Sequence, residues 1–441
     1  MLLEFKTKNY KSFKDEVVFS MIPAPKQKGL DYSILKKTAG KKEYKALCSS
    51  VVYGANAAGK SNIVSAIQTF KSIVLNGNIN NKKANVPNAA ETNLELIPNN
   101  ACKSNLPEPV SFFIKFIHKS MLFEYSLDVD LGFFLDENYK RSVKNEILKI
   151  DEKEIFRRNG KELNVNEKIL KFFDENLVSK SPKNLKIVLS ISEESLNERD
   201  LFLCNGFKTI ISSGIYDAIY EYFSLFLNSY YHSFSVNMVP SYMDKFYEDS
   251  FLNEAAKCFG IYTNKLVFVR PDNPAEMPVL CSVMDNKRFL PSITYESYGT
   301  VRFVNILPML AQTLVRGGTI VLDEFDPSLH PMVIMNILNI FHNDEINKNH
   351  AQIIFNTQNP IFLNNNLFRR DEIKFVERSD ETNCSELYSL SDFGTKGANA
   401  RKGKDYMDNY FMNKYGAIKD IDLSGIILKQ MEKYGDSKAS K

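Results

Sequence analysis

Residues 49–70 read SSVVYGANAAGKSNIVSAIQTF and combine three signals in order. The apolar run at 51–53 predicts a short buried strand, and apolar residues recur at helical spacing from 63 to 70. A loop bounded by Gly54 and Gly59 lies between them. Backbone N–H groups at such a junction, together with the positive end of the helix dipole, form a site for an anion. The stretch therefore predicts a phosphate-binding loop.

The loop matches the pattern G-x-x-x-x-G-K-S/T without a gap. In this pattern Lys60 is expected to reach the β- and γ-phosphates, and the Ser61 hydroxyl to ligate Mg²⁺. An accidental glycine-rich turn is the alternative, but the strand before the octamer and the helix after it disfavour that interpretation. We therefore predict binding of ATP with Mg²⁺, through the residues Gly54, Ala55, Asn56, Ala57, Ala58, Gly59, Lys60, Ser61 and Asn62.

The composition is that of an ordinary globular protein, with 441 residues, 44% hydrophobic and 25% charged, enough for two or three lobes. No apolar run approaches the length of a bilayer span and no leader is recognisable, so we expect a cytoplasmic protein. The six cysteines contain no C-x-x-C pair and there are only five histidines, which disfavours a disulfide scaffold and a zinc site. The net charge of +3 neither requires nor excludes DNA binding.

The segments around the loop read mostly as strands and surface loops. Residues 1–20 alternate apolar and polar side chains, which predicts an antiparallel hairpin. Residues 23–45 are lysine-rich and residues 76–105 are rich in Asn, Lys and Pro, so we expect both to be surface loops. Further apolar alternation predicts a second antiparallel sheet, with strands at 110–117, 122–129 and 145–150.

From residue 163 to 259 the pattern turns helical, with candidate helices at 168–178, 216–227 and 251–260. The aromatic residues between 216 and 234 allow either a base-stacking platform or an apolar helix face in the core. We favour the core, because aromatics at helical spacing are usually buried. Apolar runs at 265–270 and 279–284 then predict strands that return the chain to its first domain.

Residues 319–324, TIVLDE, form an apolar run that ends in two carboxylates, as expected of a central parallel strand beside the phosphate loop. Asp323 is expected to hold Mg²⁺ through water, and Glu324 to polarise the attacking water. A buried strand followed by an acidic turn is the alternative. The long separation from Ser61 implies an inserted lobe, and the chain has no N-K-x-D guanine motif.

Residues 295–302, YESYGTVR, open another predicted helix. Ser297 and Gly299 have the S-x-G arrangement of a signature loop, in which a hydroxyl and an N–H at a helix N-terminus can clasp a γ-phosphate. A plain helix cap is the alternative, but the position shortly before the D-E strand favours the signature loop. Downstream, DPSLHP at 326–331 takes the place of a D-loop, and QIIFNTQNP at 352–360 is a further apolar strand with a polar tip.

Taken together, MLLEFKTKNYKSFKDEVVFSM, the phosphate loop, ESYGTVR, VLDEFDPSLHP, FNTQNP and YFMNKYGAI resemble the SMC/RecF/OLD branch of ABC-type ATPases. The sequence is most similar to bacterial ATPases of the RloA and abortive-infection type. The resemblance implies an α/β fold, an ABC-type P-loop NTPase head with a mixed sheet, flanking helices and an antiparallel β-lobe. Residues 1–160 would form its N-terminal half, residues 161–262 an inserted helical lobe, and residues 263–441 its C-terminal half.

The resemblance also implies a homodimer that closes around two ATP molecules, with higher oligomers left open. Lys60 and Ser61 of one protomer and Ser297 and Gly299 of the other would share each nucleotide, with Asp323 and Glu324 completing the site. Lys11 stands where relatives usually carry an arginine that senses the nucleotide or the signature loop. Gln358 stands where a switch histidine is expected. Because glutamine cannot titrate, we predict slow hydrolysis.

Relatives of this kind act in defence against phage, so the resemblance implies a separately encoded effector, a nuclease or toxin. Residues 374–441 are too few for a TOPRIM nuclease. The alternative is a RecF-like DNA-binding ATPase in repair, which needs a basic surface across the dimer. Lysines crowd at 23–45 and 395–404, which read as solvated loops, so nucleic-acid contact stays open. A transporter motor would need a separate membrane subunit, and we expect no membrane contact.

Overall fold

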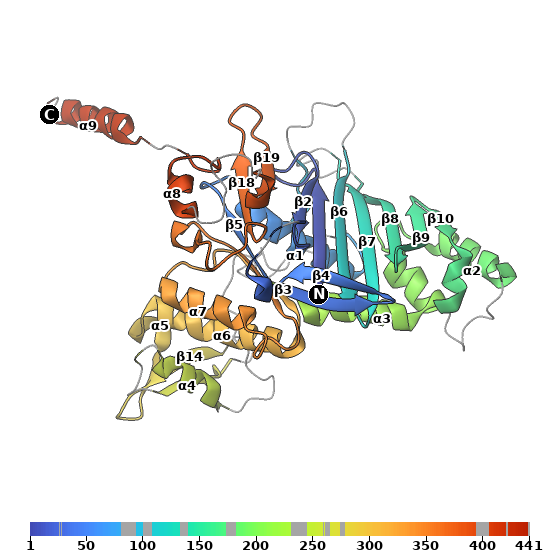
Figure 1. Ribbon diagram of the computed structural model, residues 1–441, viewed down its shortest axis with the longest axis horizontal. Coiled ribbons are helices and arrows are strands. Elements are labelled where there is room, and N and C mark those ends of the chain that lie inside the picture. Colours follow the sequence, from blue (N-terminus) through green and yellow to red (C-terminus); the bar gives the residue numbers. More distant parts are fainter. Residues whose placement is uncertain are drawn as a thin grey trace.

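The computed structural model describes residues 1–25, 27, 29–80, 94–99, 108–132, 140–172, 182–230, 245–258, 260, 265–273, 278–393, 405–419 and 422–439. Figure 1 shows a central mixed sheet, a large antiparallel sheet beside it, a small lobe around α4, and the C-terminal helix standing apart. Among the helices of these residues, none combines the length and apolar character needed to cross a membrane.

The central sheet has the strand order β11-β16-β17-β5-β18-β19. The strands are β11 Leu227–Tyr230, β16 Thr319–Leu322, β17 Gln352–Asn356, β5 Ser49–Tyr53, β18 Ile373–Arg378 and β19 Ser385–Ser389. All pairs are parallel except β18 with β19. The D-E strand β16 is a central parallel strand, as predicted, and β17 lies between it and the phosphate-loop strand β5.

The two faces of the central sheet bury alternate residues of the same strands. Val52 and Ile354 belong to the core that contains α1, Lys60–Asn76, and the antiparallel sheet. Val51 and Ile353 belong to the core on the other face, which contains residues of α6, Tyr298–Arg316, and α7, Pro331–His342. Burial on both faces explains why these strands read as continuous apolar runs rather than as alternating ones.

The large sheet has the order β10-β9-β8-β7-β6-β1-β2, and each pair is antiparallel. Its strands are β1 Leu2–Lys8, β2 Val17–Ser20, β6 Val110–His118, β7 Met121–Asp130, β8 Ser142–Ile150, β9 Lys153–Asn159 and β10 Glu162–Val165. The predicted N-terminal hairpin and the three downstream strands are confirmed. They are not two sheets, however, because β1 pairs with β6, placing Phe5 opposite Ile114.

The lysine-rich segment expected to be a surface loop contains a hairpin instead. A short 3₁₀ helix at Asp31–Ser33 leads into β3 Ile34–Ala39 and β4 Lys42–Leu47. Leu35 and Ala46 are buried in a small core with residues of β1, while the lysines dominate the composition and conceal the pattern. Of the second expected loop, 76–105, the residues 81–93 and 100–105 lie outside the described residues.

The middle of the chain is helical, as predicted, but not throughout. It contains a 3₁₀ helix at Glu167–Phe172, α2 Pro182–Ser195, a π-helical segment at Leu203–Ile211, α3 Ser213–Glu221, a second π-helical segment at Tyr222–Phe226, and α4 Ser250–Lys257. The part of the helix expected at 168–178 beyond residue 172 lies outside the described residues. β11 joins the central sheet, so residues 161–262 do not form a purely helical insertion.

Up to residue 230, the aromatic segment belongs to the core, as predicted. Tyr222 and Phe223 are fully buried. The Tyr222 ring stacks on Phe116 of β6 at 3.8 Å between centroids, and Phe223 meets Phe70 of α1 edge to face at 5.7 Å. These rings join the middle of the chain to the antiparallel sheet and to the helix of the phosphate loop.

The small lobe consists of β12 Phe246–Glu248, β13 Lys265–Val269, β14 Val279–Val283, β15 Phe289–Pro291, α4 and α5 Ser292–Tyr295. The strands predicted at 265–270 and 279–284 are confirmed. They do not return to the first sheet, since they form an antiparallel sheet of their own whose core includes Val304 of α6.

The C-terminal part adds a 3₁₀ helix at Pro360–Phe362, another at Leu390–Asp392, α8 Tyr406–Phe411 and α9 Ser424–Ala439. Residues 422–431 are all exposed, and Figure 1 shows α9 away from the rest of the molecule.

Candidate nucleotide site

The phosphate loop is built between the end of β5 and the start of α1, as the sequence predicts. A Cβ atom on Gly54 would lie 2.3 Å from the carbonyl oxygen of Val376 in β18. Gly59 has φ +112°, and a Cβ there would lie 2.6 Å from Ser12 Oγ and 2.9 Å from Ser385 Oγ. Both glycines are therefore required by close packing, and Gly59 also by its left-handed backbone.

Lys60 is buried at the mouth of this loop, with an exposed fraction of 7%. Its ammonium donates to the carbonyl oxygens of Gly54, at 2.8 Å, and Ala55, at 3.0 Å. Burial lowers the pKa of Lys60, while the nearby carboxylates of Glu324 and Asp323 oppose this shift. The ammonium of Lys60 thus contacts the phosphate loop and interacts electrostatically with the predicted metal holder Asp323 and the predicted base Glu324.

Asn356 and Arg302 hold the C-terminal end of β16, and neither was predicted as a site residue. Asn356 of β17 donates from Nδ2 to the carboxylate of Asp323, and its Oδ1 accepts from the backbone N–H of Glu324 at 2.5 Å. Arg302 of α6 donates to the backbone carbonyl of Glu324. Both residues lie inside quoted motifs, FNTQNP and ESYGTVR. Asn356 could have been recognised as a site residue in the sequence, because it is a polar residue at the end of an apolar strand.

These contacts give the two carboxylates different environments. Asp323 is buried, with 4% of its surface exposed. Glu324 has φ +47° and an exposed side chain, so its backbone is fixed while its carboxylate faces solvent. A buried acid beside the loop and an exposed acid next to it match the roles of metal holder and water activator.

The D-loop contributes a third carboxylate. Burial raises the pKa of Asp326, while a hydrogen bond with the Thr357 side chain and the charges of Arg302 and Lys60 oppose the shift. Asp326 therefore belongs to the same electrostatic cluster as Lys60.

Gln358 is exposed and lies two residues beyond the end of β17. Because β5, β16 and β17 are parallel, their carboxyl ends meet at one edge of the sheet. Gln358 therefore follows a strand that ends at the same edge as the phosphate loop and the D-E pair. Its role as the switch residue stays a prediction.

Ser297 is the N-cap of α6, where its hydroxyl accepts from the N–H of Thr300 at 3.1 Å. Its side chain is exposed. A Cβ on Gly299 would lie 2.2 Å from the carbonyl oxygen of Ser328, so this loop packs directly against the D-loop. The local role is that of a helix cap. The contact with a nucleotide of a second protomer stays a prediction.

Comparison with known proteins places the chain in a family. Residues 49–364 match the family described as "AAA domain, putative AbiEii toxin, Type IV TA system". The chain belongs to this family. Together with the strand order of the central sheet and the phosphate loop, membership identifies the fold as an α/β ABC-type P-loop ATPase head. The narrower assignment to the RloA and OLD-like ATPases stays a prediction.

Three solved structures are similar over 88% of the chain at low TM-scores. One is an SMC head bound to the C-terminal winged-helix domain of ScpA, with 16% identity, 97% of that chain covered and TM-score 0.38. The second is the SMC head domain from Thermotoga maritima, with 13% identity, 98% of that chain covered and TM-score 0.34. The third is an Smc head domain with an extended coiled coil, bound to the C-terminal domain of ScpA, from Pyrococcus furiosus. It has 15% identity, 96% of that chain covered and TM-score 0.38. No curated protein sequence matches the chain.

In this AAA-domain protein, the Lys11 ammonium is already bound by other side chains, whereas a residue that senses the nucleotide needs to be available to it. Its ammonium donates to Ser65 Oγ of α1 at 2.7 Å and pairs with the carboxylate of Glu95. The ion pair holds Lys11 one helical turn beyond Ser61. Asn62 is similarly engaged, since its side-chain amide donates to Ser12 Oγ at 2.7 Å. Both residues brace the loop in this structure, and their contact with ATP stays a prediction.

The residues present fit a nucleoside triphosphate with Mg²⁺. The two glycines hold the backbone where side chains would clash, Lys60 supplies a buried positive charge, and Ser61 lies in the first turn of α1. Asp323 presents a fixed carboxylate at the same edge of the sheet. Oxygen donors of this kind suit Mg²⁺.

Proposed function

We propose that this protein binds and hydrolyses ATP, dimerises around the nucleotide, and controls a partner effector in anti-phage defence. The observation that carries the ATPase proposal is the convergence of Lys60 with Asp323 and Glu324 at the carboxyl edge of the central sheet. Phosphoryl transfer requires positioning and charge stabilisation rather than covalent chemistry, and this edge supplies both.

Each residue has a distinct task in this proposal. The backbone N–H groups of the loop and Lys60 would bind the β- and γ-phosphates. Ser61 and Asp323 would hold Mg²⁺, which neutralises charge on the phosphate oxygens when bound. The exposed carboxylate of Glu324 would accept a proton from water, while Asn356 and Arg302 fix its backbone. Gln358 would donate to a γ-phosphate oxygen without titrating.

The placement of Ser297 supports the proposed dimer. Ser297 is exposed at a helix N-terminus that already packs on the D-loop. Ile293, Tyr295 and Tyr298 next to it are exposed by 69%, 48% and 60%. An apolar rim around an exposed helix N-terminus suits a surface that a second copy covers, and the second copy would place Ser297 against the other nucleotide.

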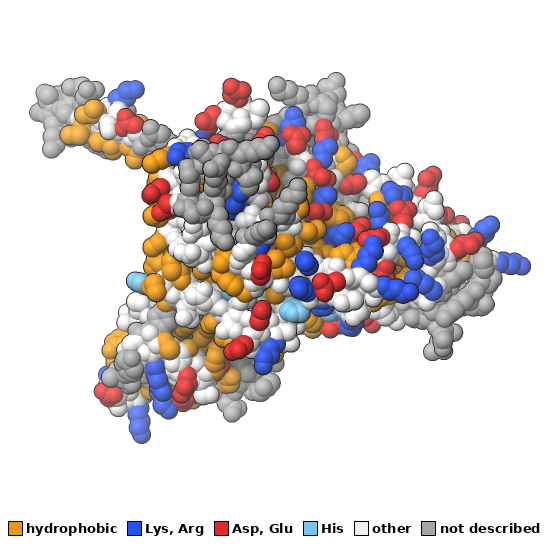
Figure 2. All heavy atoms as spheres, viewed as in Figure 1, with side chains coloured by type: hydrophobic (Ala, Val, Ile, Leu, Met, Phe, Trp, Pro, Cys, Tyr) orange, Lys and Arg blue, Asp and Glu red, His pale blue; other side chains and the backbone are white. Residues whose placement is uncertain are grey.

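The role in defence rests on the family. Its description names the AbiEii toxin and a type IV toxin–antitoxin system. We therefore propose that a separately encoded nuclease or toxin is the output, and that the protein acts in the cytoplasm. The alternative remains a RecF-like DNA-binding ATPase. On the face shown in Figure 2, Lys and Arg side chains are interspersed with Asp and Glu, which favours the first role.

The test measures molecular mass by light scattering with and without ATP, for the wild type and for Glu324→Gln. We expect Glu324→Gln with ATP to double in mass, because nucleotide is bound but not hydrolysed. Adding Ser297→Arg should keep the protein monomeric while a fluorescent ATP analogue still binds. Ser190→Arg, at an exposed serine of α2, is the matched control. An unchanged mass of Glu324→Gln with ATP would refute the dimer.

The same samples separate the two roles. Duplex DNA should not shift the ATP-bound form at physiological salt, and a protein co-purified from cells that carry the neighbouring genes should be a nuclease or toxin. ATP-dependent DNA binding without any effector would favour the repair role.

A further inference from the structure

The amino end of the central sheet, opposite the candidate nucleotide site, carries a buried cluster of three metal-ligating side chains. The sulfur of Cys48, a ring nitrogen of His342 and a carboxylate oxygen of Glu372 all lie within 4.8 Å of one another. The exposed fractions are 0% for Cys48, 5% for His342 and 0% for Glu372. We propose that Cys48, His342 and Glu372 bind one Zn²⁺ ion, although the cysteine spacing and the few histidines in the sequence disfavour a zinc site.

The fold brings these residues together from distant parts of the sequence. Cys48 directly precedes β5 and Glu372 directly precedes β18, and these strands are parallel neighbours. His342 is the last residue of α7. Parallel strands place their amino ends at one edge, so Cys48 and Glu372 meet there, and α7 brings the imidazole to the same edge.

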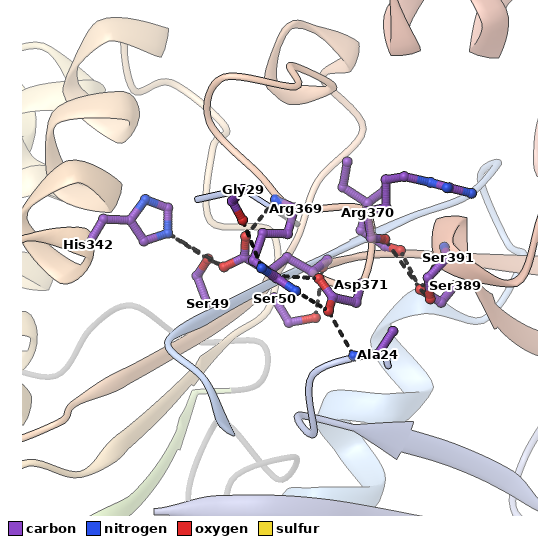
Figure 3. A network of polar contacts seen from close by, with 12 residues as sticks. Ala24, Gly29, Ser49, Ser50, His342, Arg369, Arg370, Asp371, Ser389 and Ser391 are labelled. Atoms are coloured by element: carbon purple, nitrogen blue, oxygen red, sulfur yellow. Dashed lines mark hydrogen bonds and ion pairs between the residues drawn. The ribbon is translucent and has the colours of Figure 1, made fainter. Parts of the chain in front are cut away.

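The spacing of the imidazole and the carboxylate is close to that of two ligands in a tetrahedral zinc site, and the Cys48 sulfur lies within 4.8 Å of both. His342 Nε2 and Glu372 Oε1 are 3.5 Å apart. Zinc bonds of about 2.0–2.1 Å to nitrogen and oxygen place two tetrahedral ligands about 3.3 Å apart, so little movement is needed. Ser49 Oγ lies between them, 3.0 Å from His342 Nε2 and 2.6 Å from Glu372 Oε1 (Figure 3). This hydroxyl is placed to supply the fourth ligand, an oxygen.

The surroundings fix the ligands. Glu372 Oε2 accepts from the backbone N–H of Arg369 at 2.7 Å, which leaves Oε1 directed at the cluster. The other ring nitrogen of His342, Nδ1, is buried and has no hydrogen-bond partner within the described part of the chain. The imidazole is therefore engaged only through Nε2, on the side of the cluster.

The ligand chemistry selects the ion. A thiolate and a carboxylate together balance the charge of a divalent cation, which makes burial of the site affordable. Sulfur and imidazole ligands favour Zn²⁺ over Mg²⁺, which prefers oxygen. The two ends of the sheet would therefore take different metals. The zinc site would join the strand that leads into the phosphate loop to the helix that follows the D-loop, so it goes beyond the proposed function.

The test is a titration of the full-length, metal-free wild type with Co²⁺ in the absence of nucleotide. We expect one equivalent of Co²⁺ to produce the near-ultraviolet absorption of a cobalt–thiolate bond, and equimolar Zn²⁺ to abolish it. Cys48→Ser should lose this absorption and weaken binding at least about tenfold. Cys281→Ser removes another buried cysteine, in β14, and should leave the spectrum unchanged.

Cobalt at the nucleotide site would have oxygen ligands only and would not give this absorption, so Ser61→Ala should also keep it. A wild type without the absorption would overturn the proposal, and this outcome depends on no variant folding. Retention of the absorption in Cys48→Ser would overturn it as well. His342→Asn provides a second variant, in which the thiolate remains and the affinity should still fall. Neither the absence of the absorption in the wild type nor its retention in Cys48→Ser would affect the ATPase proposal.

Discussion

The two ends of the central sheet both carry polar side chains, but they use them differently. At the carboxyl end, Glu324 and Gln358 are exposed, and Asn356 and Arg302 hold the backbone of Glu324. At the amino end, Gln352 of the same strand β17 is fully buried. Its amide contacts the N–H and C=O of Leu2, at 2.6 and 3.0 Å, the C=O of Leu47 at 2.9 Å, and Thr319 Oγ1 at 2.9 Å.

One end of the central sheet is built to receive a ligand, and the other end is built to join parts of the fold. Loops diverge from the carboxyl ends of parallel strands and leave a crevice there. At the amino end, β1 and the C-terminal end of α7 cover the strands, so polar groups must satisfy one another. Substitutions at the first end should therefore change activity, and those at the second should change stability.

The largest effect is expected for Glu324→Gln. Loss of the group that accepts a proton from water should slow ATP hydrolysis about 10²–10⁴-fold. The thermal midpoint should stay unchanged because the side chain is exposed. Phosphate release and circular dichroism melting measure the two quantities. Glu345→Gln, at another exposed glutamate, is the control. A loss of less than tenfold would show that Glu324 is not the base.

The second-largest effect is expected for Lys60→Ala. Removing the buried positive charge of the loop should lower kcat/KM for ATP about 10²–10³-fold. Binding of a fluorescent ATP analogue and steady-state hydrolysis provide the measurements. Lys42→Ala removes an exposed lysine that pairs with Glu152, and it should leave both unchanged. Equal losses in the two variants would contradict a specific role for Lys60.

Identical substitutions at Gln352, the first residue of β17, and at Gln358, two residues beyond its end, compare the two ends of the sheet directly. Gln352→Leu should lower the free energy of unfolding by at least about 3 kcal/mol, because each buried polar group left unpaired costs about 1–3 kcal/mol. Gln358→Leu should change it by less than about 0.5 kcal/mol, as is usual for exposed positions. Urea denaturation of both variants is the measurement. Similar midpoints would refute the contrast between the two ends.

The smallest effect is expected for Gln358→His. A histidine at this position can exchange a proton, so hydrolysis should become severalfold faster and the ATP-bound state shorter-lived. Single-turnover hydrolysis and the lifetime of the ATP-dependent dimer measure this change. An unchanged or slower rate would count against the switch role of residue 358.

Much of the site was predictable because its chemistry lies in contiguous motifs. The phosphate loop, the D-E pair and the signature helix were all placed correctly along the chain, with α1 beginning at Lys60 and α6 capped by Ser297. The hairpin at 34–47 was missed because its lysines conceal the alternation of its few buried residues. Strand β11 was missed because four residues after an aromatic helix show no period of their own.

Residue order alone was sufficient for the phosphate loop, because a strand, a glycine-bounded turn and a helix N-terminus form their anion site from neighbours in the chain. Pairing between distant strands established the rest. It inserted β17 between β5 and β16, placed Asn356 against Asp323, and gathered Cys48, His342 and Glu372 at the opposite edge. Such contacts depend on which strands become neighbours, and local periodicity carries no information about that choice.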